Sequence, residues 1–201
     1  FYSKKFPLGN YSYFISVLCF LLFINAFNML DGINGQAITY TIYIFLIFIF
    51  NNILSNFLII LILTLIFILI LNFRNKTYLG NSGSLLLGFL ISYVFIKSFN
   101  LENKFYADEI FLIMSIPGFD LLRLAFQRII SKKHPFKADT NHIHHLILKK
   151  KNFVITFFFI QIILILPYFL FTISNNFIYS LILSSITYIS VIYYFSGKLR
   201  S

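Results

Sequence analysis

The most informative stretch of this sequence is Asn25-Ala-Phe-Asn28-Met-Leu-Asp31-Gly32-Ile-Asn34-Gly35. It ends an apolar run without formal charge, so Asp31 is expected where a membrane span meets water. If the helix continues that far, Asn25, Asn28 and Asp31 project from one side of its last turns, because they are three residues apart. A single polar residue at a span end is typically an interfacial cap. Three at this spacing, followed by two glycines, favour a binding site.

The composition indicates the class of protein that carries this stretch. Hydrophobic residues make up 59% of the chain, aromatic residues 20% and charged residues only 11%, which is more apolar than a soluble domain. We therefore expect one integral membrane domain over residues 1–201, and such a chain is a poor candidate for nucleic-acid binding. Because the chain begins at Phe1 and not at Met, we interpret it as a fragment that lacks its natural start.

The apolar runs predict an all-α, polytopic bundle of about seven transmembrane helices. The expected spans cover residues 11–30, 37–51, 53–72, 83–98, 109–127, 153–173 and 177–196. The second and fourth are short for a bilayer. Pro117 and Pro167 fall inside spans and should kink them. Polar loops are expected at about 31–36, 73–82 and 128–152, and the last of these is the only long one.

Basic residues predict the orientation of the bundle, since they stay preferentially on the cytoplasmic side. Seven spans put the three polar loops on one face, together with twelve of the 16 Lys and Arg: Arg74, Lys76, Arg123, Arg128, Lys132, Lys133, Lys137, Lys149, Lys150, Lys151, Lys198 and Arg200. We expect this face to be cytoplasmic. The simplest interpretation of these charges is topology together with attraction to anionic lipid headgroups.

A second polar stretch on the same face is Leu79-Gly80-Asn81-Ser82-Gly83-Ser84. Glycines and serines directly before a helix make backbone N–H groups available at its positive end, where a phosphate binds well. Gly80, Ser82 and Gly83 are therefore candidate substrate-binding residues. The motif is weak by itself, because such turns are common and Ser82 also fits a simple helix cap.

The third polar stretch combines Asp120 and Arg123 with a basic loop that contains Asp139-Thr-Asn-His142-Ile-His144-His145. Three histidines close to a carboxylate suit either a transition metal or a phosphate. A zinc site is disfavoured, because the sequence has no second group of ligands. Lysines and histidines gathered in one loop fit a diphosphate site better. For Asp120 and Arg123 we favour an ion pair between positions i and i+3 over direct chemistry.

In this order, the motifs resemble those of the polyprenyl-phosphate N-acetylhexosamine-1-phosphate transferases. The resemblance is carried by Asn-x-x-Asn-x-x-Asp-Gly-x-x-Gly, by Gly-x-Ser-Gly-Ser before a span, by Pro-x-x-Asp and by Asp-x-x-His-Ile-His-His, and it runs from about Asn25 to Leu148. The His-Ile-His-His form is similar to the WecA-like branch, which begins O-antigen and enterobacterial common antigen.

The resemblance implies transfer of an N-acetylhexosamine 1-phosphate from a UDP-sugar to polyprenyl phosphate, with release of UMP and a need for Mg²⁺ or Mn²⁺. It implies that Asp31 acts near the metal or on the lipid phosphate, and that Asn25 and Asn28 orient substrate. His142, His144 and His145, with Asp139 nearby, would hold the diphosphate or the nucleotide. A homodimer is compatible with the sequence.

Three departures from the family's pattern leave an alternative open. An acidic pair on an early loop is absent, and without it turnover is not expected. Asn81 stands where the family has the aspartate that binds Mg²⁺, and an amide there should bind the cation more weakly. Asn34 stands where the family usually has a second acid. The alternative function is therefore a degenerate relative that binds lipid phosphate or a partner without turnover. The sequence does not indicate which sugar or polymer is involved.

Overall fold

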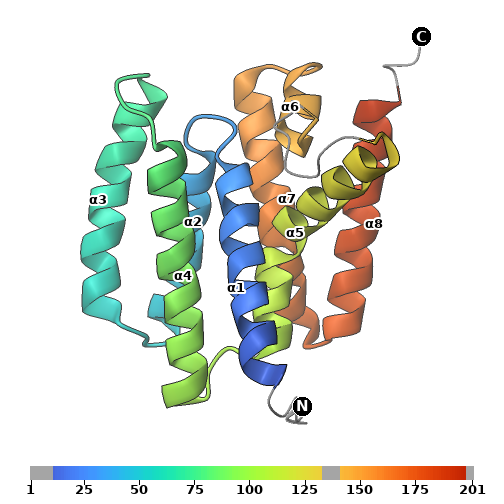
Figure 1. Cartoon of the computed structure of the whole chain (residues 1–201). Coiled ribbons are helices and arrows are strands. Elements are labelled where there is room, and N and C mark those ends of the chain that lie inside the picture. The colour runs from blue at the N-terminus through green and yellow to red at the C-terminus, as the bar shows by residue number, and fades with distance from the viewer. Residues whose placement is uncertain (1–10, 133–140, 198–201) are drawn as a thin grey trace.

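The chain folds into helices only, over the residues that the computed structural model describes, 11–132 and 141–197 (Figure 1). Seven of the eight helices match the predicted spans. The helices are α1 (Tyr11–Leu30), α2 (Gln36–Phe50), α3 (Ser55–Phe73), α4 (Gly80–Glu102), α5 (Ala107–Ile130), α6 (Ile143–Leu148), α7 (Phe153–Ser174) and α8 (Phe177–Ser196).

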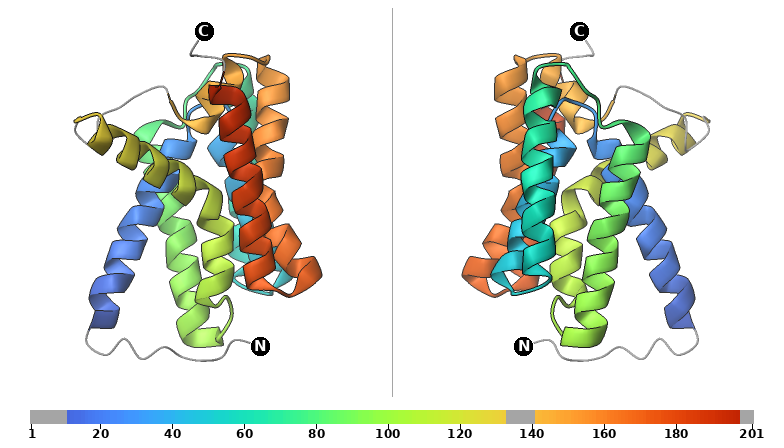
Figure 2. Two further views of the ribbon diagram at one scale, coloured as in Figure 1. Left: turned by 90° about the vertical axis from the view of Figure 1, so that its right-hand side faces the viewer. Right: turned by 90° about the vertical axis from the view of Figure 1, so that its left-hand side faces the viewer.

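The long helices stand side by side and alternate in direction, so that the loops fall at two ends of the bundle (Figures 1 and 2). One end, which we call the polar end, carries residues 31–35, the turn at 74–79 and α6. The other end carries the connections from α2 to α3, from α4 to α5 and from α7 to α8. The predicted polar stretches therefore share one end, because two long helices separate each stretch from the next.

The core of the bundle is built from aromatic and branched side chains. α1 packs mainly on α4 and α5, and α7 packs mainly on α8 and α5. Near the end opposite the polar end, the rings of Phe48, Phe95 and Phe105 meet edge to face, with the centroids of Phe48 and Phe95 4.7 Å apart. By contrast, large apolar side chains of α3, such as Phe57 and Phe67, face outward. Outward apolar side chains are expected where lipid is the solvent.

Length and composition identify this chain as a multi-pass membrane protein. In the described part of the chain, α1, α3, α4, α7 and α8 are long and apolar enough to cross a bilayer. Seven spans were predicted. Of the other two helices, α2 has 15 residues, and α5 carries Asp108, Glu109, Asp120, Arg123 and Arg128.

Three expected boundaries were wrong. α4 begins at Gly80, so the glycine and serine stretch forms its first turn and does not precede it. α4 also runs to Glu102, which makes it a long helix of 23 residues. α5 continues to Ile130 and α6 occupies residues 143–148, both inside the predicted 128–152 loop. These segments were missed because α5 ends in a mixed polar and apolar sequence and α6 has only six residues.

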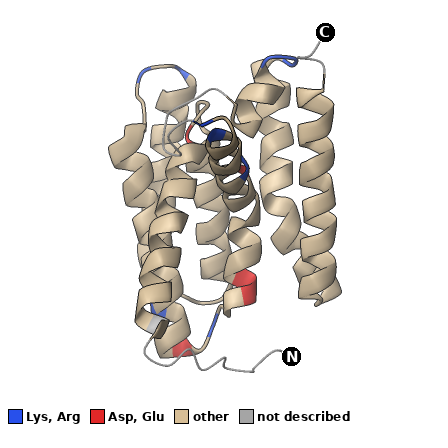
Figure 3. Cartoon of the chain, turned by 45° about the vertical axis from the view of Figure 1, so that its right-hand side comes forward, with Lys and Arg blue, Asp and Glu red and all other residues tan. Residues whose placement is uncertain are grey.

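Charge is distributed unequally between the two ends, as Figure 3 shows. Arg74 and Lys76 follow α3, and Lys149, Lys150 and Lys151 precede α7, so all five lie at the polar end. Glu102, Asp108 and Glu109 lie at the opposite end, together with Lys97 and Lys104. The positive field therefore surrounds the polar stretches, where an anionic substrate would bind.

Candidate functional site

The loop after α1 meets the histidine segment directly. His144 is buried, and the Nε2 atom of its ring lies against Gly32, where a Cβ atom would collide with the ring. Gly32 follows Asp31 in the chain, so this contact brings the imidazole of His144 next to the loop that carries the carboxylate. The sequence predicted that these two stretches share one site, and the structure shows that they lie in contact.

The start of α4 joins the same end of the bundle through Asn28. The Ser84 hydroxyl donates a hydrogen bond to Oδ1 of Asn28 and also contacts the carbonyl oxygen atoms of Gly80 and Asn81, at 3.0 and 3.2 Å. Ser84 is buried, whereas Asn81 and Ser82 are exposed. The first turn of α4 is therefore fixed against the last turns of α1, with Asn81 open to the outside. No side chain caps this helix, so Ser82 is not the cap that was considered.

Amide groups fasten the 31–35 loop to the turn after α3. Nδ2 of Asn34 donates to Oδ1 of Asn75 at 2.7 Å and to the carbonyl oxygen of Asn72 at 3.2 Å. The backbone N–H of Gly35 donates to Oδ1 of Asn72 at 2.6 Å, and Nδ2 of Asn72 donates to the carbonyl oxygen of Thr77 at 2.9 Å. Gly35 has a φ of +80°, which favours glycine. The side-chain amide of Asn34 therefore acts as a hydrogen-bond donor that holds the 31–35 loop against the turn after α3.

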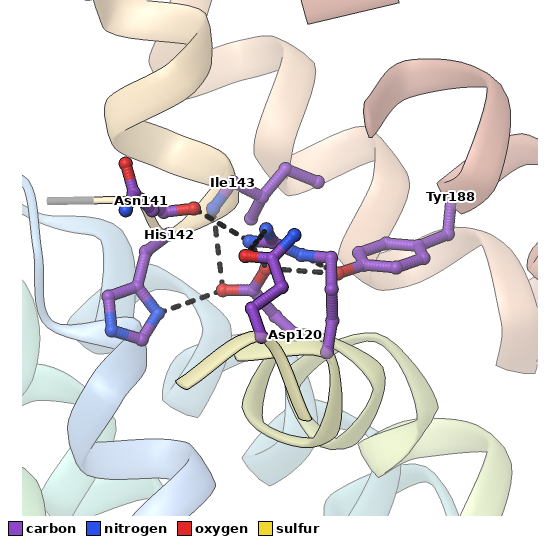
Figure 4. A network of polar contacts seen from close by, with 7 residues as sticks. Asp120, Asn141, His142, Ile143 and Tyr188 are labelled. Carbon is purple, nitrogen blue, oxygen red and sulfur yellow. Dashed lines mark hydrogen bonds and ion pairs between the residues drawn. The ribbon is translucent and has the colours of Figure 1, made fainter. Parts of the chain in front are cut away.

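Asp120 is the centre of a second network, drawn in Figure 4. Oδ1 of its carboxylate accepts from Arg123 at 2.7 Å and from the hydroxyl of Tyr188 at 2.9 Å. Oδ2 lies 2.9 Å from Nδ1 of His142 and accepts from the backbone N–H of Ile143 at 3.3 Å. The expected ion pair of Asp120 and Arg123 is confirmed, and the network also links α5 to α8 and to the start of α6.

This network determines how His142 is presented. A carboxylate accepts hydrogen bonds and does not donate them, so Nδ1 of His142 carries the proton in this contact. The other ring nitrogen, Nε2, is then left for a ligand. The rings of His142 and His144 are stacked with centroids 5.5 Å apart, and those of His144 and His145 are 4.3 Å apart. The three histidines therefore form one compact group.

Burial sets the charge of two groups at this site. It lowers the pKa of His144 to about 3, with the neighbouring His145 and His142 adding to the effect, so His144 is neutral at pH 7. Burial also raises the pKa of Asp31 to about 6. Across the described residues, no side chain donates a hydrogen bond to the Asp31 carboxylate. Asp31 is therefore mostly ionised at pH 7 and open to a ligand.

Comparison with known proteins agrees with these motifs and with this geometry. Residues 1–99 match the model of glycosyl transferase family 4. Over these residues, just under half of its length, the chain is similar to this family.

Named proteins that are similar to this chain include three from bacteria. The undecaprenyl-phosphate alpha-N-acetylglucosaminyl 1-phosphate transferase of Escherichia coli K12 is 29% identical over 161 residues, and the match covers 74% of this chain and 44% of the relative. The Yersinia pestis protein of the same name is 28% identical, covering 71% and 42%. A Bacillus subtilis protein, named a probable undecaprenyl-phosphate N-acetylglucosaminyl 1-phosphate transferase, is 29% identical, covering 72% and 43%.

The chain thus spans less than half the length of the curated relatives it matches. No solved structure matches it.

Most of the residues predicted for the site lie at the polar end. Asp31, Asn28, His142, His144 and His145 do so through the contacts above. Gly80, Asn81, Ser82 and Gly83 lie in the first turn of α4. Asn25 is different, because it is exposed and its amide donates to the carbonyl oxygen of Leu21 in its own helix at 2.8 Å. Asp139 lies outside the described residues.

The structure adds Ser84, Asn72, Asn75 and Tyr188 to these contacts, and none of them was among the predicted site residues. Ser84 was part of a quoted stretch, and its place next to the glycines was the only signal. Asn72 and Asn75 stand where an apolar run ends, which suggests a turn but not a partner. Tyr188 lies in an apolar helix and gave no signal, because its partner Asp120 is 68 residues away in the chain.

Proposed function

We propose that the protein transfers an N-acetylhexosamine 1-phosphate from a UDP-sugar to polyprenyl phosphate and releases UMP. The reaction would take place on the cytoplasmic face of the inner membrane of a bacterium and begin a cell-envelope polysaccharide such as lipopolysaccharide. The observation that carries this proposal is the meeting of the Asp31 loop, the first turn of α4 and the α6 histidines at the basic end of a membrane bundle. The names of the relatives support the same chemistry.

The proposed reaction has simple requirements. An oxygen of polyprenyl phosphate attacks the phosphorus atom that bears the sugar, and the bond from this phosphorus to the UMP oxygen breaks, so UMP leaves with the bonding electrons. Negative charge builds on the phosphoryl oxygens during the displacement. A site for this step therefore needs hydrogen-bond donors and positive charge held in place beforehand, at the depth where a lipid phosphate meets a soluble nucleotide.

The described residues can fill distinct roles in such a step. His142, held by Asp120, presents Nε2 to the diphosphate or nucleotide. His144 and His145 lie beside it, and His144 acts as a neutral imidazole, which can donate one hydrogen bond. Asp31, with no donor from a neighbouring side chain in the described part, is free to act on the lipid phosphate or on a cation. Asn28 orients the first turn of α4 through Ser84.

A divalent cation fits this donor set as a shared ligand. Mg²⁺ usually takes one or two carboxylates together with substrate phosphates and water. Asp31 supplies one carboxylate and Asn81 an exposed amide oxygen, whereas no group of three His, Cys, Asp or Glu in the described ranges forms a metal site of its own. Mg²⁺, or Mn²⁺ in its place, would offset the charge of the diphosphate when bound.

The test is an assay of the natural full-length protein, purified in detergent, with UDP-N-acetylglucosamine, polyprenyl phosphate and Mg²⁺. We expect UMP to appear, with the sugar phosphate on the lipid. Omitting the lipid should abolish the release. Asp31→Asn should abolish it too, whereas Asp108→Asn, the matched change at the other end of the bundle, should not. Absence of UMP with every divalent cation tried would contradict the proposal. Release of UMP only after Asn81→Asp would support the degenerate relative.

A further inference from the structure

A small cavity lies directly beneath the histidines, between α1, α2, α5, α6 and α7. Its polar lining comes from Gln36, Asp120 and His144, and the remaining wall is apolar. The volume open to the centre of a water molecule is about 10 Å³. A cavity of this size holds about one water molecule and excludes a sugar or a lipid chain.

Gln36 supplies this cavity with hydrogen-bonding groups that have no partner among the described residues. Its side chain is fully buried, and neither Nε2 nor Oε1 has a hydrogen-bond partner among the described residues. A buried primary amide has two donors and an acceptor to satisfy, and leaving them unpaired in an apolar interior is strongly unfavourable. A buried amide without a partner, beside a space large enough for one water molecule, is where an ordered water is expected.

On the same helix, Oγ1 of Thr39 is also buried without a hydrogen-bond partner among the described residues, but Thr39 does not line the cavity. Thr41 is as buried as Gln36, and its hydroxyl donates to the carbonyl oxygen of Ala37 at 2.9 Å. Gln161 of α7 donates to the backbone carbonyl oxygen of Gln36 at 3.0 Å, so it fixes the start of α2 but leaves the Gln36 side chain unpaired. Gln36 is therefore buried, unpaired and part of the lining that it shares with His144.

We propose that Gln36 binds one ordered water molecule in this cavity and, through it, acts as a positioning residue for His144. A neutral imidazole has one donor and one acceptor nitrogen, and the hydrogen bond on one nitrogen sets the tautomer of the ring. A water held by the Gln36 amide supplies such a partner from below the ring. The binding of water stands on the geometry alone, whereas its effect on turnover rests on the proposed function.

The experiment compares the natural full-length protein with Gln36→Leu, which keeps the approximate volume and removes the amide. Thr41→Val is the matched control, since it removes a buried polar group of the same helix that is already paired. Three measurements are made on each: the density in the cavity at a resolution that shows ordered water, the ¹⁵N signals of the His144 ring, and kcat and KM for UMP release.

We expect density for one water beside the Gln36 amide, its loss in Gln36→Leu, a shift of the His144 ¹⁵N signals, and a kcat about tenfold lower with KM changed less than about twofold. Thr41→Val should leave all three unchanged. A dry cavity with a more heat-stable Gln36→Leu protein would overturn the water site. Density with unchanged His144 signals and unchanged kcat would overturn the positioning role. If the protein released no UMP at all, the proposed function would fail, while the density and the ¹⁵N signals would still decide this inference.

Discussion

Two aspartates at the polar end carry the same functional group and are used in opposite ways. Asp120 is buried, and both its oxygens accept hydrogen bonds, from Arg123, Tyr188, His142 and the backbone N–H of Ile143. Asp31 is half-buried, receives no side-chain hydrogen bond from the described residues and has a pKa raised to about 6 by burial. The fold therefore uses both oxygens of the Asp120 carboxylate for hydrogen bonds. The Asp31 carboxylate stays available to a ligand.

The largest effect is expected from Asp31→Asn, which tests the open carboxylate. The change keeps the shape and removes the charge, so we expect UMP release to fall by roughly 10³-fold, as when a preorganised charge at the reacting groups is lost. Thermal stability in detergent should not fall, because no described side chain depends on this carboxylate. A variant that stays active but unfolds at a lower temperature would reverse the roles assigned to the two aspartates.

Asp120→Asn tests the occupied carboxylate and should affect both properties. His142 loses its ionised partner and its fixed orientation, so we expect kcat to fall by about 10²-fold. The stability should drop by about 3 kcal/mol, because Arg123 is left in a mostly buried site without its counter-charge. Tyr188→Phe is the milder control and should cost about 1–2 kcal/mol, because the hydroxyl donates to Asp120 and accepts from Nε of Arg123. Loss of activity with unchanged melting would argue that Asp120 touches the substrate.

Acid should destabilise the protein, and the two sites contribute with opposite signs. The pKa of His144 lies near 3 in the folded protein and near 6.5 when unfolded, so stability is lost as the pH falls from about 6.5 towards 3. Asp31 has its pKa raised from 3.8 to about 6, which favours the folded state as the pH falls through that window. The His144 shift is larger. Because the two windows overlap between about pH 4 and pH 6, the contributions largely cancel there, and we expect a net loss of only about 0.3 kcal/mol per pH unit.

Melting temperatures measured between pH 7 and pH 5 test this balance. His144→Phe should reverse the dependence, so that stability rises as the pH falls, because the contribution of Asp31 then acts alone. Asp31→Asn should make the dependence steeper, because the opposing contribution is lost. The same slope in all three proteins would refute the assignment of acid sensitivity to these two groups.

The smallest effect is expected from placing a carboxylate where the fold uses an amide. Asn34→Asp removes the donor that bonds Asn75 and the carbonyl oxygen of Asn72, and it puts an acceptor opposite two acceptors. We expect a loss of about 1–2 kcal/mol in stability and no gain in activity. Asn81→Asp, at an exposed position, should leave melting unchanged and lower the Mg²⁺ concentration needed for half-maximal activity. A stabilising Asn34→Asp would contradict the amide network.

The sequence predicted what depends on local order. Apolar runs located seven helices, the alternation of spans placed three distant polar stretches at one end, and the spacing of Asp120 and Arg123 predicted their ion pair. The sequence did not predict the hydrogen bonds between residues that are far apart in the chain. Asp120 pairs with His142, 22 residues away in the chain, and Asn34 pairs with Asn75, 41 residues away. In both cases the neighbouring sequence gives no indication of the partner.

The boundaries of α4, α5 and α6 were missed for a different reason. Polar residues at a membrane surface are compatible with both helix and loop, so hydropathy alone does not show where a helix ends. In α6, the histidines that suggested an exposed loop are themselves partly or wholly covered by neighbouring segments.

Gly32 offers a way to separate assembly of the bundle from assembly of the site. Since the His144 ring occupies the space where a Cβ atom would stand, adding a single methyl group at position 32 must push the imidazole away from the loop that carries Asp31. The packing of the long helices does not depend on that space. Gly32→Ala would thus yield a bundle that still inserts and folds. In this variant the His144 ring and the Asp31 loop are held apart, so the site does not assemble.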